Sequence, residues 1–596
     1  VPYRMWQFLL LFWALSLSSR PGTFARDFVG TPAECKTAEF VPGYNLAGEG
    51  FDIVTMQRKG AYVVNMEDWK KPKGSCNLRQ NRYLKGKKQK IPLAIVDWRT
   101  LPNCKRQLSS TIYESSESLV NDSTSSVENN WKTGLDLNVN PNVQVGATLG
   151  GTHSRDATYA MQKSKQDKYS FTSHEVHCKF YRYRLVTKPP VHTEFLESLK
   201  MLPRSYTSDT KEQYRGLINI YGTHFIRQVS LGGKVKSITS IKSCQATMNG
   251  LTDTAVKDCL DVEASATVGM VATVKTEFHR CESLKKKMNL AQSFGSMFSD
   301  RQTEITGGQI DSADLFFSGA SDPSAYKQWL ETLKTIPDVV SYSLEPLHKL
   351  MPPNDPRARQ LQRALGDYVL ENALLKKCSE PCQVGDRVSA RDCCACVCKG
   401  NNNVKSNCCP AGKGLAQLQV YGLEAKQLYG DRGTKTDGSV KVTFGEKSRR
   451  TEVINENDNP VWPEKFEFGN IVINMATKLQ VEVFDADSRW NSDLLGECSF
   501  ALKSGTNKNV CYFKHGTFFF SYTVECAPSL GGPQCNEYIP SPMSPSLATK
   551  FHSRNGVLAS ESWVPEFRKN QAKSRNLKCN SSASHEEEIG YSMSQG

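Results

Sequence analysis

The chain has 596 residues, which at roughly 150 residues per domain predicts about four structural units. Apolar residues make up 39% of the chain and charged residues 23%, which excludes a mostly disordered or collagen-like protein. The 20 cysteines indicate an oxidising compartment. The formal net charge of +14 favours anionic partners, and composition does not choose between lipid headgroups and nucleic acid.

Residues 1–25 have the pattern of a secretory signal peptide. An apolar run of Phe, Leu and Trp over residues 8–15 follows Arg4 and is too short to span a bilayer as a helix. Thr23-Phe24-Ala25 suits signal cleavage. A buried core helix is the alternative interpretation. We therefore expect an exported protein that folds as a soluble molecule.

Residues 26–375 have the pattern of one large unit of mixed helices and strands. Phe195, Leu199 and Leu202 share one predicted helical face. Two further helices are predicted after Asp322-Pro323 and Asp355-Pro356. An aspartate followed by proline suits a helix start, because the carboxylate caps free amides and proline is tolerated in the first turn.

Two stretches of this unit, 139–149 and 262–274, alternate between apolar and small or polar residues. Thirteen strand residues extend roughly 43 Å, and at a tilt of about 45° they cover the ~30 Å hydrocarbon core. The candidate membrane-spanning residues are Val139, Val143, Val145, Ala147, Leu149, Val262, Ala264, Ala266, Val268, Met270, Ala272 and Val274.

Each stretch is followed by a polar, basic segment and a weaker alternating return. Each pair predicts a transmembrane β-hairpin, over 139–185 and 262–298, with one lipid face and one wet face. An amphipathic strand packed on a core is the alternative. Small residues give both stretches weak preferences, and 154–168 and 282–294 are equally compatible with amphipathic helices. Such a balance suits a segment that changes structure on entering a membrane.

Between the two stretches lies Tyr221-Gly222-Thr223-His224-Phe225, followed after six residues by Gly232-Gly233. This spacing resembles the signature of the membrane-attack-complex/perforin (MACPF) family. The resemblance implies an α+β multidomain protein whose 26–375 domain is a bent antiparallel sheet with helical clusters. The glycine pair suits a hinge or bulge, because it has no side chains to resist bending. His224 has no partnered nucleophile nearby in the sequence, so a structural role is favoured over a catalytic one.

Residues 376–412 hold eight closely spaced cysteines. Zinc binding is the alternative to disulfides, but export and the lack of paired histidines favour disulfides. The segment resembles the EGF-like shelf that follows the pore-forming domain in that family. The resemblance further implies the pairs Cys104–Cys178 and Cys259–Cys281, and a bond from Cys244 to this segment. Connectivity is otherwise open, and Cys393 and Cys579 are extra to the pattern.

The candidate disulfide cysteines are Cys35, Cys76, Cys104, Cys178, Cys244, Cys259, Cys281, Cys378, Cys382, Cys394, Cys396, Cys398, Cys408, Cys409, Cys498, Cys511, Cys526 and Cys535.

Residues 413–535 alternate in strand fashion, with turns rich in Gly, Asp and Asn. Carboxylates gather at two loops, and because residues i and i+2 of an extended chain point to one side, some of them can converge on one cation. Hard oxygen ligands favour Ca²⁺. An ordinary surface acid is the alternative for any single aspartate. The candidate calcium ligands are Asp431, Asp437, Asp485, Asp487 and Asp493.

With Asn459-Pro460-Val461-Trp462 and a predicted turn at Leu494-Leu495-Gly496, this acidic set resembles a C2 domain. Tyr429 and Trp490 lie beside the acids, and we expect them to enter the lipid headgroups once calcium binds. Cys498 with Cys511, and Cys526 with Cys535, are expected to staple the domain.

Enzyme motifs are absent from the sequence: it has no Gly-x-Ser-x-Gly, no His-Glu-x-x-His and no phosphate-binding loop. Nucleic-acid signatures are absent as well. Asn121 and Asn580 stand in Asn-x-Ser glycosylation sites. The tail at 536–596, rich in Ser, Pro and Lys, is predicted to be poorly ordered.

The resemblance covers nearly the whole chain and implies a non-enzymatic, calcium-dependent cytolytic protein of immune defence. Such a protein is stored in cytolytic granules, docks on a target membrane, assembles into a homo-oligomeric ring and inserts two hairpins per subunit into a β-barrel pore. Its implied partners are phospholipid, its own copies and co-released proteases that pass through the pore. The main alternative is a family member that docks with calcium and does not perforate. Complement-type pore formers lack the terminal calcium module, and a lipid-hydrolysing enzyme would need a nucleophile site.

Overall fold

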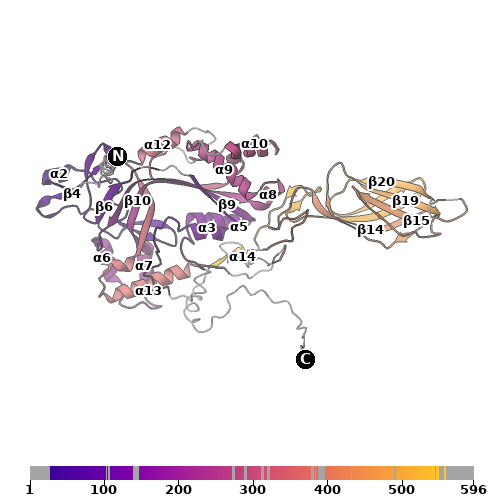
Figure 1. The fold of residues 1–596 in the computed structure, drawn as a ribbon. Coiled ribbons are helices and arrows are strands. Elements are labelled where there is room, and N and C mark those ends of the chain that lie inside the picture. Colours follow the sequence, from indigo (N-terminus) through magenta and orange to yellow (C-terminus); the bar gives the residue numbers. More distant parts are fainter. Residues whose placement is uncertain are drawn as a thin grey trace, which may run out of the picture.

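The protein is elongated, with a mixed helix-and-strand domain at one end and an all-strand domain at the other (Figure 1). The computed structural model describes residues 27–102, 104, 108–137, 147–270, 275–287, 291–310, 315–317, 323–376, 382, 384–386, 396–430, 432–488, 491–543, 545–548 and 556–558. Outside them lie the predicted signal peptide at 1–25 and the predicted residues Val139, Val143, Val145, Ala272, Val274, Cys378, Cys393, Cys394, Asp431, Trp490, Cys579 and Asn580.

Two long antiparallel strands, β9 (Tyr169–Leu185) and β10 (His224–Lys242), form the middle of the central sheet. Their pairing runs from Gln228–Arg184 to Lys242–Tyr169. Shorter strands pair with β9 on its other side, and others with β10. They are β6 (Ile95–Thr100) and β7 (Leu108–Tyr113) on β9, then β2 (Glu49–Asp52), β11 (Arg301–Thr306) and β12 (Asp338–Pro346) on β10, with β3 (Gln57–Tyr62) pairing β2.

A small three-stranded sheet at the amino-terminal side is stapled by the Cys35–Cys76 disulfide. It consists of β1 (Asp27–Gly30), β4 (Cys76–Asn81) and β5 (Lys87–Lys90), beside the helix α2 (Pro32–Thr37) and the 3₁₀ turns at Pro72–Gly74 and Arg82–Leu84. Another 3₁₀ turn, at Leu347–Leu350, follows β12.

The predicted helices of the large domain are present. Asp355 caps α13 by accepting the Arg357 N–H at 2.9 Å, as the Asp-Pro pattern predicts. The helix predicted from Phe195 and Leu199 buries both residues. Pro323 directly precedes the helix that begins at Ser324, whereas Asp322 lies outside the described residues. The helices are α6 (Thr193–Met201), α7 (Lys211–Tyr221), α12 (Ser324–Thr332) and α13 (Pro356–Glu371).

Two further groups of helices interrupt pairs of neighbouring strands. One group lies between β7 and β9 in the chain, and the other between β10 and β11. The first holds α3 (Ser116–Asp122), the short strand β8 (Ala147–Thr148) and α5 (Arg155–Gln166). The second holds α8 (Ser243–Met248), α9 (Asp253–Thr267), α10 (Lys275–Lys287) and α11 (Phe294–Met297).

The strand prediction for 262–274 is wrong for residues 262–267 of the folded monomer, because α9 continues through Thr267, whereas residues 271–274 lie outside the described residues. Thr252 caps this helix by accepting the Ala255 N–H, and alanine is the strongest helix former. Leu260 and Ala264 are fully buried and four residues apart, which is a helical spacing, so packing overrides the period-two pattern. The amphipathic-helix interpretation of 154–168 agrees with α5. Spanning by either stretch concerns a different state and stays a prediction.

The Gly232-Gly233 pair lies inside β10, where the register with β9 shifts between Leu231 and Gly232. A Cβ on Gly232 would stand 1.8 Å from the carbonyl oxygen of Cys178, and one on Gly233 would meet Trp329 and Leu333 at 2.6 and 2.5 Å. The pair therefore forms a bulge and allows close packing of the neighbouring strand and α12.

We predict that Gly232→Ala destabilises the domain by roughly 1–3 kcal/mol, because backbone must move to admit the methyl group. Gly216→Ala is the matched control: a Cβ there, in the middle of α7, meets nothing within 4 Å. Removing a helix glycine should raise stability by about 0.5–1 kcal/mol. Chemical denaturation of both variants measures the difference, and equal effects would contradict the close approach.

The all-strand domain packs two antiparallel sheets around a core that includes Trp462, Phe518 and Phe520. One sheet contains β14 (Leu415–Lys426), β17 (Val461–Trp462), β18 (Phe466–Val472), β21 (Gly505–Phe513) and β22 (Gly516–Cys526). The other contains β15 (Gly438–Phe444), β16 (Lys447–Arg450), β19 (Leu479–Ser488) and β20 (Asn491–Phe500).

The predicted turn at Leu494-Leu495-Gly496 is wrong, because these residues lie inside β20. Val483 pairs with Gly496 and Phe484 with Leu494, so Leu495 is the extra residue of a bulge. A Cβ on Gly496 would meet the Phe513 ring at 2.2 Å, which explains the glycine by packing instead of by a turn.

Disulfides connect the cysteine-rich segment to the large domain and staple the strand domain. The pairs are Cys104–Cys178, Cys244–Cys409, Cys259–Cys281, Cys382–Cys396, Cys398–Cys408, Cys498–Cys511 and Cys526–Cys535. Those outside the cysteine-rich segment, and the bond from Cys244 to it, are the pairs expected from the sequence.

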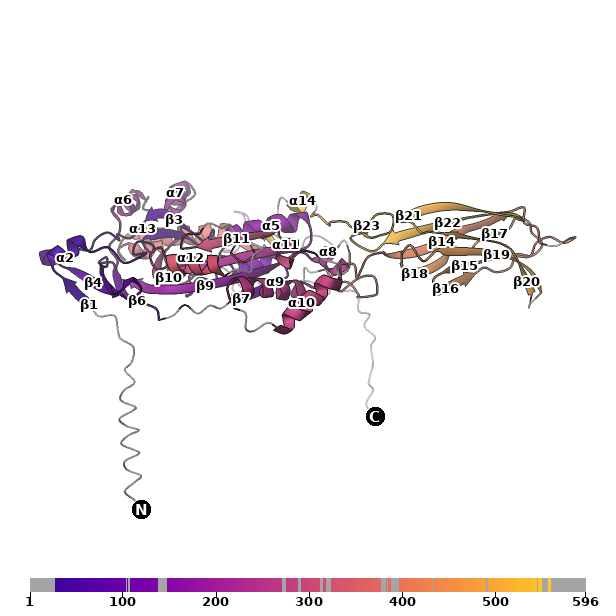
Figure 2. The ribbon, with the colours of Figure 1, turned by 90° about the horizontal axis from the view of Figure 1, so that it is seen from above.

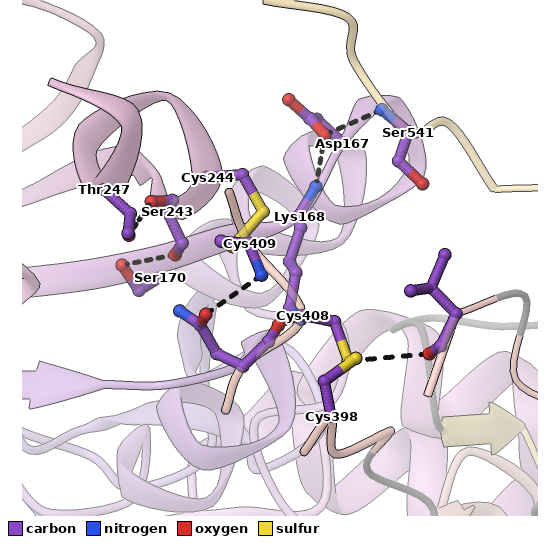
Figure 3. The surroundings of a disulfide bond; sticks show 12 residues. Asp167, Lys168, Ser170, Ser243, Cys244, Thr247, Cys398, Cys408, Cys409 and Ser541 are labelled. Carbon is purple, nitrogen blue, oxygen red and sulfur yellow. Dashed lines mark hydrogen bonds between the residues drawn. A yellow bond between two sulfur atoms is a disulfide. The ribbon is translucent and has the colours of Figure 1, made fainter. Parts of the chain in front are cut away.

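The first part of the tail is ordered, which corrects the prediction for 536–596. Asp167, buried at the end of α5, accepts the Ser541 N–H at 2.9 Å (Figure 3). It also accepts the Tyr538 hydroxyl, and the Met543 N–H donates to Lys165 O at 2.9 Å. These polar contacts do not depend on apolar content, so composition did not reveal them. The tail elements are β24 (Glu537–Tyr538), which pairs β23 (Leu530–Gly531), α14 (Pro545–Ala548), and β25 (Gly556–Leu558), which pairs β13 (Leu374–Lys376).

Candidate membrane-insertion segments and calcium site

Both interrupting groups of helices start and end at the same end of the β9–β10 ladder. The Tyr113–Phe171 pair closes the β7–β9 ladder at that end, and the Thr239–Arg301 pair closes the β10–β11 ladder. In Figure 1 the helices α3, α5, α8, α9 and α10 gather there, on the side that faces the strand domain. Each group is therefore an insertion between two strands that are already hydrogen-bonded neighbours.

Polar contacts fasten α5 to the sheet. Asp156 accepts from Lys236 at 2.7 Å, and Lys163 lies 2.6 Å from Asp300. Burial is the largest single influence and lowers the pKa of the Lys236 ammonium, but the charge and hydrogen bond of Asp156 together with the charges of Glu175 and Glu304 outweigh it, so the net pKa is raised. The apolar anchor of the helix is small, with Ala157, Ala160 and Met161 buried. Little apolar area must be exposed when this helix leaves the sheet.

α9 is held by a similar set of polar contacts. Glu263 accepts the N–H groups of Phe294 and Gly295 at 2.8 Å each, which ties α9 to the start of α11. Asp261 lies 3.0 Å from the Nε2 of the buried His174 on β9, and it accepts from Lys257 at 2.6 Å. The Cys259–Cys281 disulfide joins α9 to α10.

The signature histidine belongs to the fold. His224 is fully buried, with Nε2 3.0 Å from the carbonyl oxygen of Trp131 and Nδ1 2.7 Å from the Thr223 hydroxyl. A carbonyl only accepts, so Nε2 carries the proton. Burial lowers the pKa of His224 to about 3, which keeps the ring neutral. The structure gives it a backbone partner and no nucleophile, which supports the structural role expected from the sequence.

We predict that His224 makes the domain less stable as pH falls. The folded-state pKa lies below the unfolded value of about 6.5, so protons bind preferentially to the unfolded chain between those two values. The free energy of unfolding should fall by up to about 1.4 kcal/mol per pH unit from this group below about pH 6.5. His348, whose pKa burial lowers to about 4, acts in the same direction.

The measurement is denaturant unfolding at several pH values. His224→Asn should flatten the slope of stability against pH, whatever its effect on stability at neutral pH. His279→Asn is the control, because this side chain is exposed on α10. An unchanged slope in the His224 variant would contradict the neutral buried ring.

Two of the candidate calcium ligands meet in the strand domain. Asp485 is only 4% exposed, and its Oδ1 accepts the Asp437 N–H at 2.7 Å. A Cβ on Gly430 would lie 1.4 Å from Oδ2 of Asp485, so this carboxylate faces the loop before β15. Asp493 pairs with Asp485 across β19 and β20. Three carboxylate residues on β20, on β19 and just before β15 therefore lie at one end of this sheet.

Carboxylate oxygens are ligands that calcium prefers, so the gathering of Asp437, Asp485 and Asp493 is compatible with the calcium site expected from the sequence. Among the described residues, no group of three or more His, Cys, Asp or Glu is close enough to hold a metal ion. Asp431 lies outside the described residues, as does the side chain of Asp487. Tyr429 is 51% exposed beside this end of the domain and stacks on His515, with ring centroids 6.0 Å apart.

Sequence reasoning missed Asp167, Glu263 and the His174–Asp261 contact. Each makes a hydrogen bond or ion pair with residues that are distant in the chain, and no local sequence motif predicts such a contact. Asn121, a predicted glycosylation site, is exposed near the end of α3. Within the described part of the chain, no helix is both long and apolar enough to cross a membrane.

Comparison with known families defines the class of protein. The MAC/Perforin domain family matches residues 40–377, the Perforin-1-like EGF domain family matches 377–411 and the C2 domain family matches 416–514. The chain belongs to the MAC/Perforin family and carries EGF and C2 domains after its family domain.

Among curated relatives, the chain is similar to Perforin-1 of Rattus norvegicus, with 40% identity over 516 residues that cover 86% of this chain and 93% of the relative. Perforin-1 of Homo sapiens is 39% identical, covering 85% and 92% of the two chains. A solved structure described as a C2 domain is 38% identical, covers 18% of this chain and 98% of its own, and has a TM-score of 0.18. The family domain and these relatives support a pore-forming cytolytic protein.

Proposed function

We propose that the protein is a secreted, calcium-dependent cytolysin that docks on a target membrane through its C2 domain. It then assembles into rings of its own copies and inserts two β-hairpins per subunit into a β-barrel pore. The C2 match, the carboxylates of Asp437 and Asp485 and the exposed Tyr429 support docking. Storage in cytolytic granules and delivery of proteases through the pore follow from similarity to Perforin-1 alone.

One observation carries the insertion step. Each helical group interrupts a pair of strands that are already neighbours in the sheet, so unfolding the helices lets both ladders grow without rearranging the sheet. The backbone hydrogen bonds lost in α5 and α9 are replaced by hydrogen bonds between strands. This replacement is required, because backbone N–H and C=O groups in hydrocarbon have no water to bind. The polar contacts that hold α5 and α9 can be exchanged for water before insertion, whereas the buried apolar contacts of Val256 and Leu260 on α9 must also be broken.

The proposed calcium site would hold the ion with Asp437, Asp485 and Asp493, together with Asp431 and Asp487. Bound calcium would neutralise these carboxylates and add positive charge beside Tyr429, facing anionic or zwitterionic headgroups. Asp485 would also keep the loop before β15 in place through the Asp437 N–H.

We predict that Asp485→Asn raises the calcium concentration for half-maximal liposome binding by roughly tenfold, because one ligand charge is lost while the shape is kept. Glu525→Gln, an exposed acid on β22, is the control and should leave the calcium requirement unchanged. Liposome co-sedimentation across a calcium series measures both. Binding by the wild type in the presence of a chelator would contradict calcium-dependent docking.

We predict that Ala266→Lys leaves docking intact and reduces dye release, since a lysine on the lipid face costs roughly 2–4 kcal/mol at the bilayer midplane. Ala266 is only half-buried in α9, so the folded monomer tolerates the change. Ser283→Lys, exposed on α10, is the control. Dye release by Ala266→Lys at the wild-type rate would contradict spanning by this stretch.

A family member that docks without perforating is the alternative function. It would bind liposomes with calcium and release no dye, whereas the proposed cytolysin does both. Calcium-dependent lysis of erythrocytes by the purified protein therefore decides between them.

A further inference from the structure

The β10–β11 ladder and one disulfide share a register. Lys234 pairs with Thr306, and each step forward along β10 is matched by one step back along β11 until Thr239 pairs with Arg301. Twenty residues beyond Thr239 is Cys259, and twenty residues before Arg301 is Cys281. Those two cysteines are bonded to each other in the folded monomer, with their Cα atoms 5.5 Å apart.

We propose that the Cys259–Cys281 disulfide stays closed during insertion and fixes the register of the second membrane hairpin. The hairpin is then a direct continuation of the β10–β11 ladder, with its turn at residues 269–271. The proposal rests on the pore formation proposed above and specifies which residues cross the bilayer.

Strand geometry admits the bridge in this register. Directly opposed residues of an antiparallel pair have Cα atoms about 4.5 or 5.5 Å apart, and disulfides span about 4.4–6.8 Å. The 5.5 Å separation seen between α9 and α10 can therefore be kept when both helices become strands. No thiol chemistry is needed for the change.

The hairpin over 262–298 predicted from the sequence conflicts with the closed bridge. If 262–274 were one spanning strand, Cys259 would lie about 50 Å from residue 274 at a rise of about 3.3 Å per residue. The chain from 274 to Cys281 can return at most about 24 Å. The two cysteines would then be more than 25 Å apart, so that register requires the disulfide to open.

The residue pattern agrees with the register set by the bridge. Opposed residues of a hairpin point to the same face, so apolar positions on one strand must face apolar positions on the other. Val262 falls opposite Phe278, Ala266 opposite Val274 and Val268 opposite Ala272, while Ala264 falls opposite Thr276 and Leu260, near the end of the spanning part, opposite Arg280. On the other face, Asp261 falls opposite His279 and Ser265 opposite Lys275.

The length also agrees. Residues 259–268 and 272–281 give ten residues on each strand, within the about 9–11 that a tilted strand needs to cross a bilayer. Phe278, which is 50% exposed on α10, gains a lipid contact, whereas residues 282–298 remain outside the hydrocarbon.

Disulfide mapping of the wild-type pore is the first test. Pores assembled on liposomes are isolated, digested without reduction and analysed by mass spectrometry. The proposal requires the Cys259–Cys281 peptide pair to be intact in inserted subunits. Free or alkylated Cys259 in inserted subunits overturns it, and failure of the wild type to form pores overturns the proposed function as well.

Cross-linking separates the two registers. Ala264→Cys/Thr276→Cys places cysteines opposite each other in the proposed register, and Ala264→Cys/Ser296→Cys does so in the register of the 262–298 hairpin. Ala264 is fully buried in the main core of the monomer, so its cross-link should appear only after insertion. We expect oxidised pores to show the 264–276 cross-link and at least tenfold less of the 264–296 cross-link. Pores with the 264–296 cross-link, or with neither, overturn the register.

Discussion

Backbone hydrogen bonds between β9 and β10 run from the Gln228–Arg184 pair to the Lys242–Tyr169 pair, and the rest of the large domain is fastened to this ladder. β7 and β11 continue it on either side, and both helical groups leave it at one end. In the monomer α5 and α9 pack beside these strands, and in the proposed pore new strand extends the ladder from that end.

The helices α5 and α9, which pack beside this ladder, must be stable in the monomer and still able to leave the sheet. α5 buries Ala157, Ala160 and Met161 and is held by polar contacts, so it loses little apolar burial on release. α9 also buries Val256 and Leu260 and loses more. A disulfide fixes the start of the helical group between β10 and β11: Cys244, in α8, is bonded to Cys409 of the cysteine-rich region (Figure 3). The wider arrangement, seen from above in Figure 2, sets the strand domain at the end of the sheet where these segments lie. Docking by that domain would therefore hold the segments near the membrane.

Much of the fold follows from the sequence, and the exceptions have physical reasons. The Asp355-Pro356 start of α13 is local chemistry and was predictable, as was the bulge at Gly232-Gly233. The helix through Ala264 was not, because alanine and threonine fit both periods and long-range packing decides between them. The hydrogen bond from the Ser541 N–H to Asp167 was likewise not predictable. A buried carboxylate whose hydrogen-bond donors are distant in the chain leaves no pattern in the sequence.

The central claim is that helices become membrane strands while the sheet that holds them persists. Infrared spectra of the amide I band, recorded on liposomes before and after calcium-triggered dye release, measure this conversion directly. The account predicts a loss of helix signal equivalent to α5 and α8–α11 and a matching gain of strand signal when dye is released. Dye release with unchanged helix content would contradict it.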